Sequence, residues 1–147
     1  MNSINVYRFA KDDKEKIISI IKSEIENYED ILFAYLYGSL VDHEMPFVRD
    51  IDIGIYVSDM EKAKRWNYEV RIINDIEKRL KDEGFYIPVD VKVINMSDVL
   101  YVHDVIRGRL LFVKDESLWA DFVVEVSKKY NDFYPLWDHF MKEALSP

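Results

Sequence analysis

The strict alternation of residue types over residues 50–57 constrains the fold of this chain more than any other segment. Its apolar side chains share one face of the strand: Ile51, Ile53, Ile55 and Val57. Its polar or small residues share the other face: Asp50, Asp52, Gly54 and Tyr56. Side chains of a β-strand have a period of two, so this segment predicts a strand with one buried face. The apolar run of residues 31–37 predicts a second, buried strand that ends at Gly38-Ser39. The chain is therefore expected to build a sheet.

Helical and extended patterns alternate along the rest of the chain. The first expected helix is capped by Asp12 or Asp13 and reaches Tyr28. A long helix follows the capping-box form of residues 58–61, carries Trp66 in its apolar stripe and ends at Gly84. A strand over 89–94, a short helix capped by Ser97 and reaching Ile106, a strand over 110–113 and a C-terminal helix complete the chain. Pro135 should break or kink the last helix. This pattern favours an α/β (α+β) fold, a small mixed sheet of about four strands flanked by helices. We expect one domain over residues 1–147, with residues 117–147 as a C-terminal helical extension.

The composition excludes several classes of protein. Among 147 residues, 28 are Asp or Glu and 20 are Lys or Arg, which gives a formal charge of −8 and argues against a nucleic-acid groove or a surface for anionic membranes. The chain has no cysteine, no signal-peptide pattern and no apolar run of membrane-spanning length. A cytoplasmic protein is the resulting expectation, and one nucleotide in a pocket remains compatible with the charge.

Polar residues that carry chemistry stand on three successive predicted strands: Gly38-Ser39, Asp50 with Asp52, and Asp90. Taken alone, Gly38-Ser39 is equally consistent with a turn and a helix cap, and paired aspartates occur on solvated sheet faces. Taken together, the three carboxylates would converge across neighbouring strands. Such a cluster is suited to two magnesium ions about 4 Å apart, which serve phosphoryl or nucleotidyl transfer.

Other residues near these motifs have more than one interpretation. The amides at the start of a helix, together with the Ser39 hydroxyl, would bind the phosphates of a nucleoside triphosphate. Gly54 either leaves room for a ligand or marks a sheet irregularity. Lys92 is equally a phosphate ligand or a neutralising neighbour of Asp90. For Arg49, a surface ion pair with Glu44 is favoured over a phosphate contact.

The combination of these motifs resembles the minimal nucleotidyltransferases of the DNA polymerase beta superfamily. Gly38-Ser39 is followed after ten residues by Asp50-Ile51-Asp52 and later by Asp90 between two valines. Arg49 departs from that family, which usually has a small hydroxyl residue there. The small size and the aromatic C-terminal helix are similar to those of MNT-type antitoxins partnered by HEPN-domain toxins.

The resemblance implies both a mechanism and a partner. Asp50 and Asp52 would hold both magnesium ions, Asp90 would hold the catalytic one and help to activate the attacking hydroxyl, and Gly38 and Ser39 would bind ATP. The protein would transfer AMP from ATP to a tyrosine of a cognate HEPN ribonuclease toxin and so silence it. Two alternatives are a nucleotidyltransferase for small molecules such as antibiotics, and a module that neutralises a toxin by contact alone.

Overall fold

The computed structural model of this protein describes residues 7–8, 11–41 and 47–146. In chain order the elements are β1 (Tyr7–Arg8), α1 (Lys11–Ile25), β2 (Ile31–Tyr37), β3 (Phe47–Val48), β4 (Ile51–Val57), α2 (Met60–Ala63), α3 (Tyr68–Asp82), β5 (Val89–Val93), α4 (Val99–Ile106), β6 (Arg109–Val113) and α5 (Glu116–Ala144). Within the described residues, no helix is both long and apolar enough to cross a membrane.

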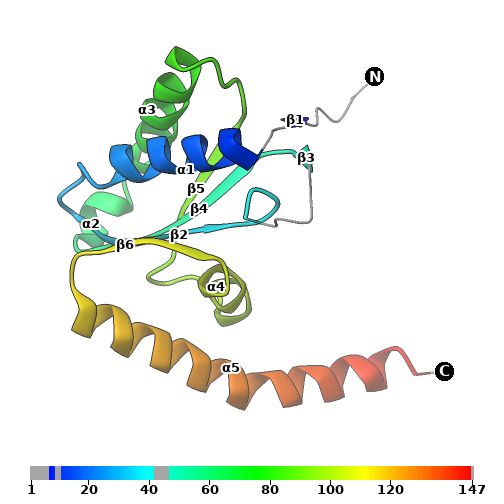
Figure 1. Cartoon of the computed structure of the whole chain (residues 1–147). Coiled ribbons are helices and arrows are strands. Elements are labelled where there is room, and N and C mark those ends of the chain that lie inside the picture. Colours follow the sequence, from blue (N-terminus) through cyan, green and yellow to red (C-terminus); the bar gives the residue numbers. More distant parts are fainter. Residues whose placement is uncertain (1–6, 9–10, 42–46, 147) are drawn as a thin grey trace.

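A four-stranded mixed sheet forms the centre, in the strand order β5-β4-β2-β6 (Figure 1). β2 runs antiparallel to β4 and to β6, whereas β4 and β5 are parallel. The end of β2 and the starts of β4 and β5 therefore lie at one end of the sheet. Helices α1 and α3 cover one face, and α4 with the first part of α5 covers the other. The mixed α/β fold expected from the sequence is confirmed.

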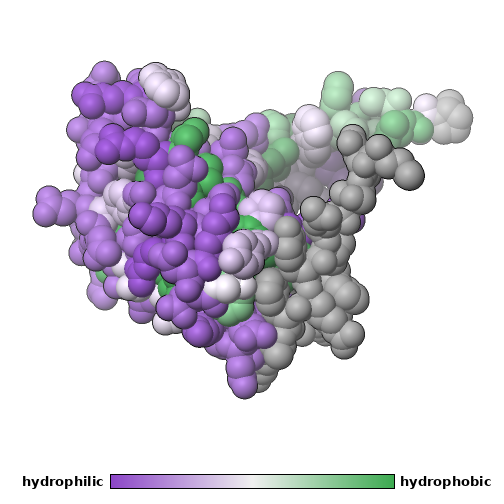
Figure 2. All heavy atoms as spheres, turned by 90° about the horizontal axis from the view of Figure 1, so that it is seen from above, coloured by the Kyte–Doolittle hydropathy of each residue, from purple (hydrophilic) through white to green (hydrophobic). Residues whose placement is uncertain are grey.

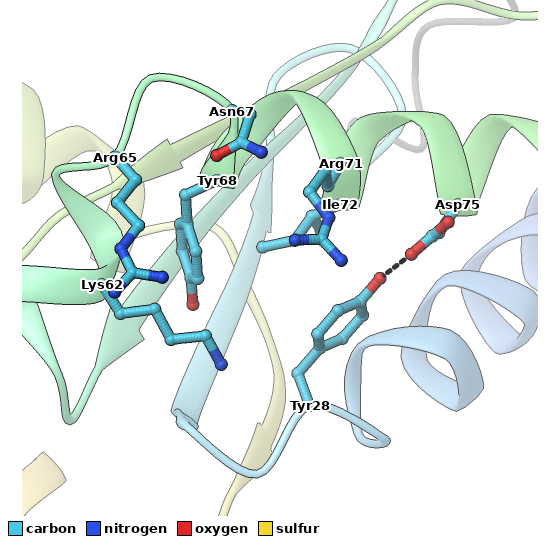
Figure 3. A pocket seen from close by; sticks show the side chains of 8 residues that line it. All are labelled: Tyr28, Lys62, Arg65, Asn67, Tyr68, Arg71, Ile72 and Asp75. Carbon is cyan, nitrogen blue, oxygen red and sulfur yellow. Dashed lines mark hydrogen bonds between the residues drawn. The ribbon is translucent and has the colours of Figure 1, made fainter.

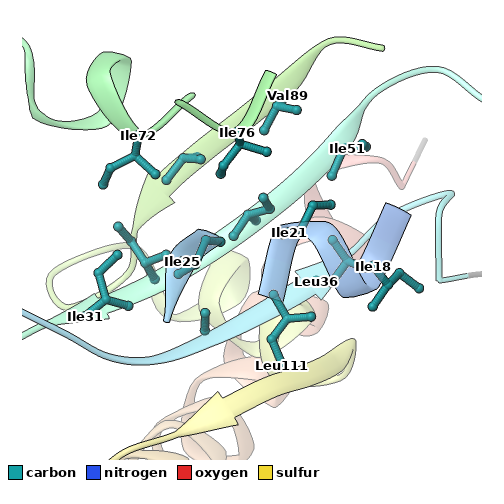
Figure 4. Packing of buried hydrophobic residues seen from close by; sticks show 14 of the residues in the cluster. Ile18, Ile21, Ile25, Ile31, Leu36, Ile51, Ile72, Ile76, Val89 and Leu111 are labelled. Atoms are coloured by element: carbon teal, nitrogen blue, oxygen red, sulfur yellow. The ribbon is translucent and has the colours of Figure 1, made fainter. Parts of the chain in front are cut away.

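The larger core lies between the sheet and the pair α1 and α3 (Figure 4). Each helix contributes a buried stripe with helical spacing: Ile17, Ile18, Ile21 and Ile25 from α1, and Tyr68, Ile72, Ile76 and Leu80 from α3. The apolar face of β4 meets these stripes, and Ile51, Ile53 and Ile55 are fully buried. Full burial of such a side chain contributes about 1.5–3 kcal/mol. This packing fixes the register that places the polar face of β4.

The predicted long helix after β4 is wrong, because it consists of two helices. α2 ends at Ala63, and α3 begins only at Tyr68. Trp66, expected in the apolar stripe, lies between them and is 88% exposed. The cap of α2 is Asp59, whose side chain accepts a hydrogen bond from the Lys62 amide, and not Ser58.

Several predicted boundaries differ from the structure. α1 begins at Lys11 and ends at Ile25, so Asp12 and Asp13 lie in its first turn instead of capping it, and Tyr28 lies beyond it. Asp98, not Ser97, caps α4, and its side chain accepts a hydrogen bond from the Leu100 amide. The short pair of β1 and β3 was not anticipated, because two residues carry too little pattern to predict a strand.

Helix α5 continues through Pro135, which therefore does not break it. Its first half packs on the sheet through Val126, whereas its second half extends away from the sheet (Figure 1). Large apolar side chains are exposed on this second half and at its C-cap: Phe133, Leu136, Trp137 and Phe140, and the cap residue Leu145. Figure 2 shows apolar residues gathered on the projecting end of the molecule. We call these five residues the α5 apolar surface.

Candidate active site

The three predicted carboxylates come together at one end of the sheet. Asp52 lies in β4 opposite Asp90 of the parallel strand β5, and opposite Tyr37 of β2. Asp50 directly precedes β4, one residue outside the strand in which it was expected, and is exposed. Asp52 and Asp90 are half-buried, so each is only partly accessible to solvent.

Gly38 lies against the carboxylate of Asp52. Its φ of +83° is in the left-handed region that favours glycine. A Cβ added at Gly38 would stand 2.6 Å from Oδ2 of Asp52, well inside van der Waals contact. Two requirements therefore coincide at this residue: the sharp turn that ends β2, and the space that the Asp52 carboxylate occupies.

The electrostatics of Asp52 report how close the carboxylates are. Its pKa is raised from 3.8 to about 6, first by burial and then by the negative charges of Asp50 and Asp90. Both causes disfavour the ionised form, since burial removes hydration and neighbouring anions repel it. A cation placed among these groups would reverse both effects.

The donor set fits a hard divalent cation. Among the residues that the structure describes, no three Asp, Glu, His or Cys side chains are grouped so as to hold a metal ion as they stand. Asp50, Asp52 and Asp90 are nevertheless close enough for their charges to raise the pKa of Asp52, and carboxylate oxygens are the ligands that magnesium prefers. These three residues would hold the ions.

The backbone after Gly38 differs from the expectation of a helix start. Residues 39–41 form a turn, in which the amide of Val41 donates to the carbonyl oxygen of Gly38 over 3.3 Å. Ser39 is partly exposed beside this turn. Within the described residues, a phosphate at Gly38 and Ser39 would therefore contact a turn and not the first turn of a helix. Glu44, the expected partner of the exposed Arg49, lies outside the described residues.

Two tyrosines next to the carboxylates were missed in the sequence. The hydroxyls of Tyr37 and Tyr101 share a hydrogen bond, and their rings meet edge to face with centroids 5.9 Å apart. Burial raises the pKa of both hydroxyls, and the charges of Asp52 and Asp90 add to this. Tyr37 could have been found from its place before Gly38 in β2. Tyr101 carried no signal, because only the fold brings α4 to this edge.

Lys92 lies two residues after Asp90 in β5, and Glu69 of α3 interacts electrostatically with both of them. Burial raises the pKa of Glu69, and the nearby charge of Lys92 lowers it. Lys92 is exposed and thus has a carboxylate neighbour other than Asp90. Both interpretations of Lys92, as a phosphate ligand and as a neutralising residue, stay open. Glu69 was not anticipated, because only the packing of α3 beside β5 brings it near Lys92.

Gly54 makes room for a helix and not for a ligand. A Cβ at this position would stand 2.6 Å from Cγ1 of Val105 in α4 and 3.1 Å from Cγ2 of Ile94. Both predicted interpretations, a ligand space and a sheet irregularity, are therefore replaced by close helix packing. By this packing α4 approaches β4 and carries Tyr101 to the carboxylates.

Comparison with known families gives one match. The model of the family described as polymerase beta, nucleotidyltransferase matches residues 15–117, about two thirds of the chain. The matched region contains all four strands of the central sheet, together with all three aspartates. No curated protein sequence matches the chain significantly.

Solved structures share this fold at low sequence identity. A chain of the complex of tri-AMPylated HEPN toxin with MNT antitoxin from Shewanella oneidensis is 15% identical, with a TM-score of 0.62 over 91% of this chain and 97% of that chain. A chain of a toxin–antitoxin structure with AMP-PNP is 16% identical, with a TM-score of 0.66 over 91% and 99%. A chain of the toxin–antitoxin structure MntA-HepT is 14% identical, with a TM-score of 0.62 over 93% and 100%. At such identities the likeness concerns the fold.

Proposed function

Because this chain belongs to the polymerase beta nucleotidyltransferase family, we propose that it transfers AMP from ATP to a tyrosine hydroxyl of a HEPN-type toxin. The observation that carries the proposal is the site at the end of the sheet, where Gly38 opens space for Asp52 beside Asp50 and Asp90. The solved structures of similar fold include an AMPylated HEPN toxin in complex with its MNT antitoxin, which supports the choice of acceptor. The reaction needs ATP, so its proposed setting is the cytoplasm.

The proposed chemistry assigns one task to each residue. Gly38 and Ser39 bind the triphosphate, and Asp90 accepts the proton of the tyrosine hydroxyl. The hydroxyl oxygen then forms a bond to the α phosphorus of ATP while the bond from that phosphorus to the bridging oxygen breaks. Pyrophosphate leaves with the electrons of that bond, and the tyrosine keeps the AMP group.

Asp50, Asp52 and Asp90 are the proposed ligands of two magnesium ions. When bound, the ions stabilise the negative charge that develops on the attacking and leaving oxygens. The raised pKa of Asp52 supports this assignment, because a carboxylate whose charge is opposed by burial and by two other anions gains most from a nearby cation.

The α5 apolar surface supports a protein partner. Its five large side chains are exposed on a helix that extends beyond the domain, and the rings of Phe133 and Trp137 stack with centroids 6.2 Å apart. Aromatic residues in a contiguous exposed group are typical of the central part of protein interfaces. The excess of negative charge suits a partner that binds RNA and is therefore basic.

Transfer of labelled AMP tests the proposal. The full chain is incubated with magnesium, ATP labelled at the α phosphate, and the product of the adjacent gene as the candidate partner. The same incubation is run with the Asp50→Asn, Asp52→Asn double variant. An Asp82→Asn, Asp121→Asn variant is the matched control, because it removes the same charge from two exposed positions outside the proposed site. We expect label on the partner with the parent and the control, and none with the first variant.

The alternatives give different results in the same experiment. Label on a small molecule in a lysate, with none on any protein, would replace the proposal by a small-molecule nucleotidyltransferase. A tight complex that forms without label and is insensitive to the Asp50→Asn, Asp52→Asn change would replace it by a module that neutralises the toxin by contact.

A further inference from the structure

A second polar pocket lies at the opposite end of the sheet from the three aspartates. It has a volume of about 320 Å³ and is bordered by the segment before β2 and by α2 and α3 (Figure 3). Ile31, the first residue of β2, is seven residue steps from Gly38, or about 23 Å at the rise of an extended strand. The pocket is therefore distinct from the candidate active site.

The pocket gathers positive charge in an acidic protein. Lys62, Arg65 and Arg71 line it. Figure 3 shows the charged ends of Lys62 and Arg71 turned toward the space between the rings of Tyr28 and Tyr68, and that of Arg65 on the other side of the Tyr68 ring. The chain as a whole carries a formal charge of −8, so three cations around one cavity are a local exception. Such an arrangement attracts an anion.

Two of these three cations lack an acidic partner. Lys62 lies 3.7 Å from a carboxylate oxygen of Asp30. Arg65 and Arg71 have no ion pair or side-chain hydrogen bond within the part of the chain that the structure describes. Their guanidinium groups are free to bind a ligand, and guanidinium forms paired hydrogen bonds with phosphate oxygens.

The carboxylates near the pocket are already engaged. Asp75, which lines it, accepts a hydrogen bond from the Tyr28 hydroxyl, and Asp30 accepts one of 2.5 Å from the Tyr68 hydroxyl. Both bonds orient a tyrosine ring as a wall of the cavity. An anion in the cavity would meet Arg65 and Arg71, whose two positive charges outweigh the one negative charge of Asp75.

The start of α3 adds further donors to the same place. Asn67 is the N-cap of this 15-residue helix, yet its side chain makes no capping hydrogen bond. The first amides of a helix lack partners within the helix and favour negative charge. Asn67 lines the pocket, and the first helix amide, that of Tyr68, already donates to the carbonyl oxygen of Arg65, so only the amides that follow it are available there.

From these features we propose that the pocket between Tyr28 and Tyr68 binds a small phosphorylated molecule, with Arg65 and Arg71 holding its phosphoryl group. The volume is at the lower end of the range of small-molecule sites, which suits a mononucleotide or a smaller phosphate ester. This site is separate from the proposed AMP transfer and does not depend on it.

Calorimetric titration of the full chain in EDTA tests the proposal with three probes: inorganic phosphate, AMP and adenosine. We expect phosphate and AMP to bind and adenosine not to bind. Tighter binding of AMP than of phosphate identifies the rings as part of the site, whereas equal binding identifies the phosphoryl group as the sole recognised part. The Arg65→Ala, Arg71→Ala variant should weaken binding about tenfold or more, because it removes charge-assisted hydrogen bonds.

Matched variants keep the result interpretable. Lys78→Ala, Lys81→Ala removes the same charge from exposed positions of α3 that do not line the pocket, and should bind like the parent. The Asp50→Asn, Asp52→Asn variant should also bind like the parent, which separates this site from the candidate active site. Should the arginine variant fail to fold, Arg71→Gln alone makes the same comparison. Absence of phosphate and AMP binding, or binding that the arginine change leaves intact, would overturn the proposal.

Discussion

The carboxylate of Asp52 fills the space that a side chain at Gly38 would need: a Cβ on Gly38 would stand 2.6 Å from Oδ2 of Asp52. The two residues come from antiparallel strands, because Tyr37 at the end of β2 pairs with Asp52 in β4. The glycine of the Gly-Ser motif is thus tied to the aspartate pair by packing as well as by backbone conformation. This contact explains why the two motifs belong together.

Replacing Gly38 by alanine should separate stability from activity. The positive φ costs about 1 kcal/mol for a residue with a Cβ. The Asp52 carboxylate is the end of a side chain and can turn away at little further cost. A displacement of this kind in a catalytic group lowers turnover about 100-fold. Urea unfolding and the labelling assay measure the two effects.

Gly84→Ala is the control for that change. Gly84 has a φ of +88°, but a Cβ there would meet no atom within 4 Å. The two alanine variants should therefore lose similar free energies of unfolding, while only Gly38→Ala loses AMP transfer. Equal AMP transfer by the two variants would show that the contact between Gly38 and Asp52 is not needed for activity.

Asp52→Asn should change how stability depends on pH. The pKa of Asp52 in the folded protein, about 6, lies above its usual 3.8, so the folded state binds the proton more tightly than the unfolded state. This group therefore stabilises the fold fully below about pH 4, and the contribution is lost as the pH rises through 6. The Asp52→Asn variant has no ionisable group at this position and does not lose this stability as the pH rises. In EDTA its free energy of unfolding at pH 8 should exceed that of the parent by about 1 kcal/mol, a value reduced for solvent screening.

Urea unfolding of parent and variant at pH 5 and pH 8 gives the comparison. Asp82→Asn, at an exposed position at the end of α3, serves as the control and should shift stability equally at both pH values. A parent that is as stable as Asp52→Asn at pH 8 would contradict the repulsion between the carboxylates.

The sheet and the carboxylate cluster could be predicted because short-range patterns determine them. Residues 31–37 form β2 with the predicted boundaries, and the period of two in residues 51–57 places Asp52 on the face opposite the buried isoleucines. Asp90 follows the same rule in β5, and parallel pairing sets it opposite Asp52. Each of these placements needs only the alternation along a strand and adjacency within one sheet.

The surroundings of the cluster could not be predicted, because they depend on how helices pack. Gly54 has no side chain where Val105 approaches, and this contact brings Tyr101 to Tyr37. Neither partner of such a contact is visible from periodicity. The break before α3 was missed for a related reason: apolar spacing continues through Trp66, although tertiary packing leaves that side chain in solvent.

Because α2 and α3 are separate helices, alanine substitutions at two apolar residues with compatible helical spacing should have very different effects on the free energy of unfolding. Trp66→Ala should change the free energy of unfolding by no more than about 0.5 kcal/mol, since the ring is 88% exposed. Ile76→Ala should cost about 2–5 kcal/mol, because this side chain is fully buried between α3 and the sheet. Urea unfolding measures both, and a large loss for Trp66→Ala would restore the single long helix that the sequence favoured.

Pro135 should weaken the second half of α5 without weakening the domain. Proline lacks the amide that would donate to the carbonyl of Asn131, and its ring crowds that carbonyl, which costs about 3 kcal/mol in a helix interior. Pro135→Ala should therefore slow amide hydrogen exchange over residues 129–145. The midpoint of urea unfolding should stay unchanged, because all described residues beyond Val126 in α5 are at least partly exposed. Ala144→Gly, at the end of the same helix, is the control and should leave exchange before residue 140 unaltered. Faster exchange in Pro135→Ala would show that the proline supports this helix.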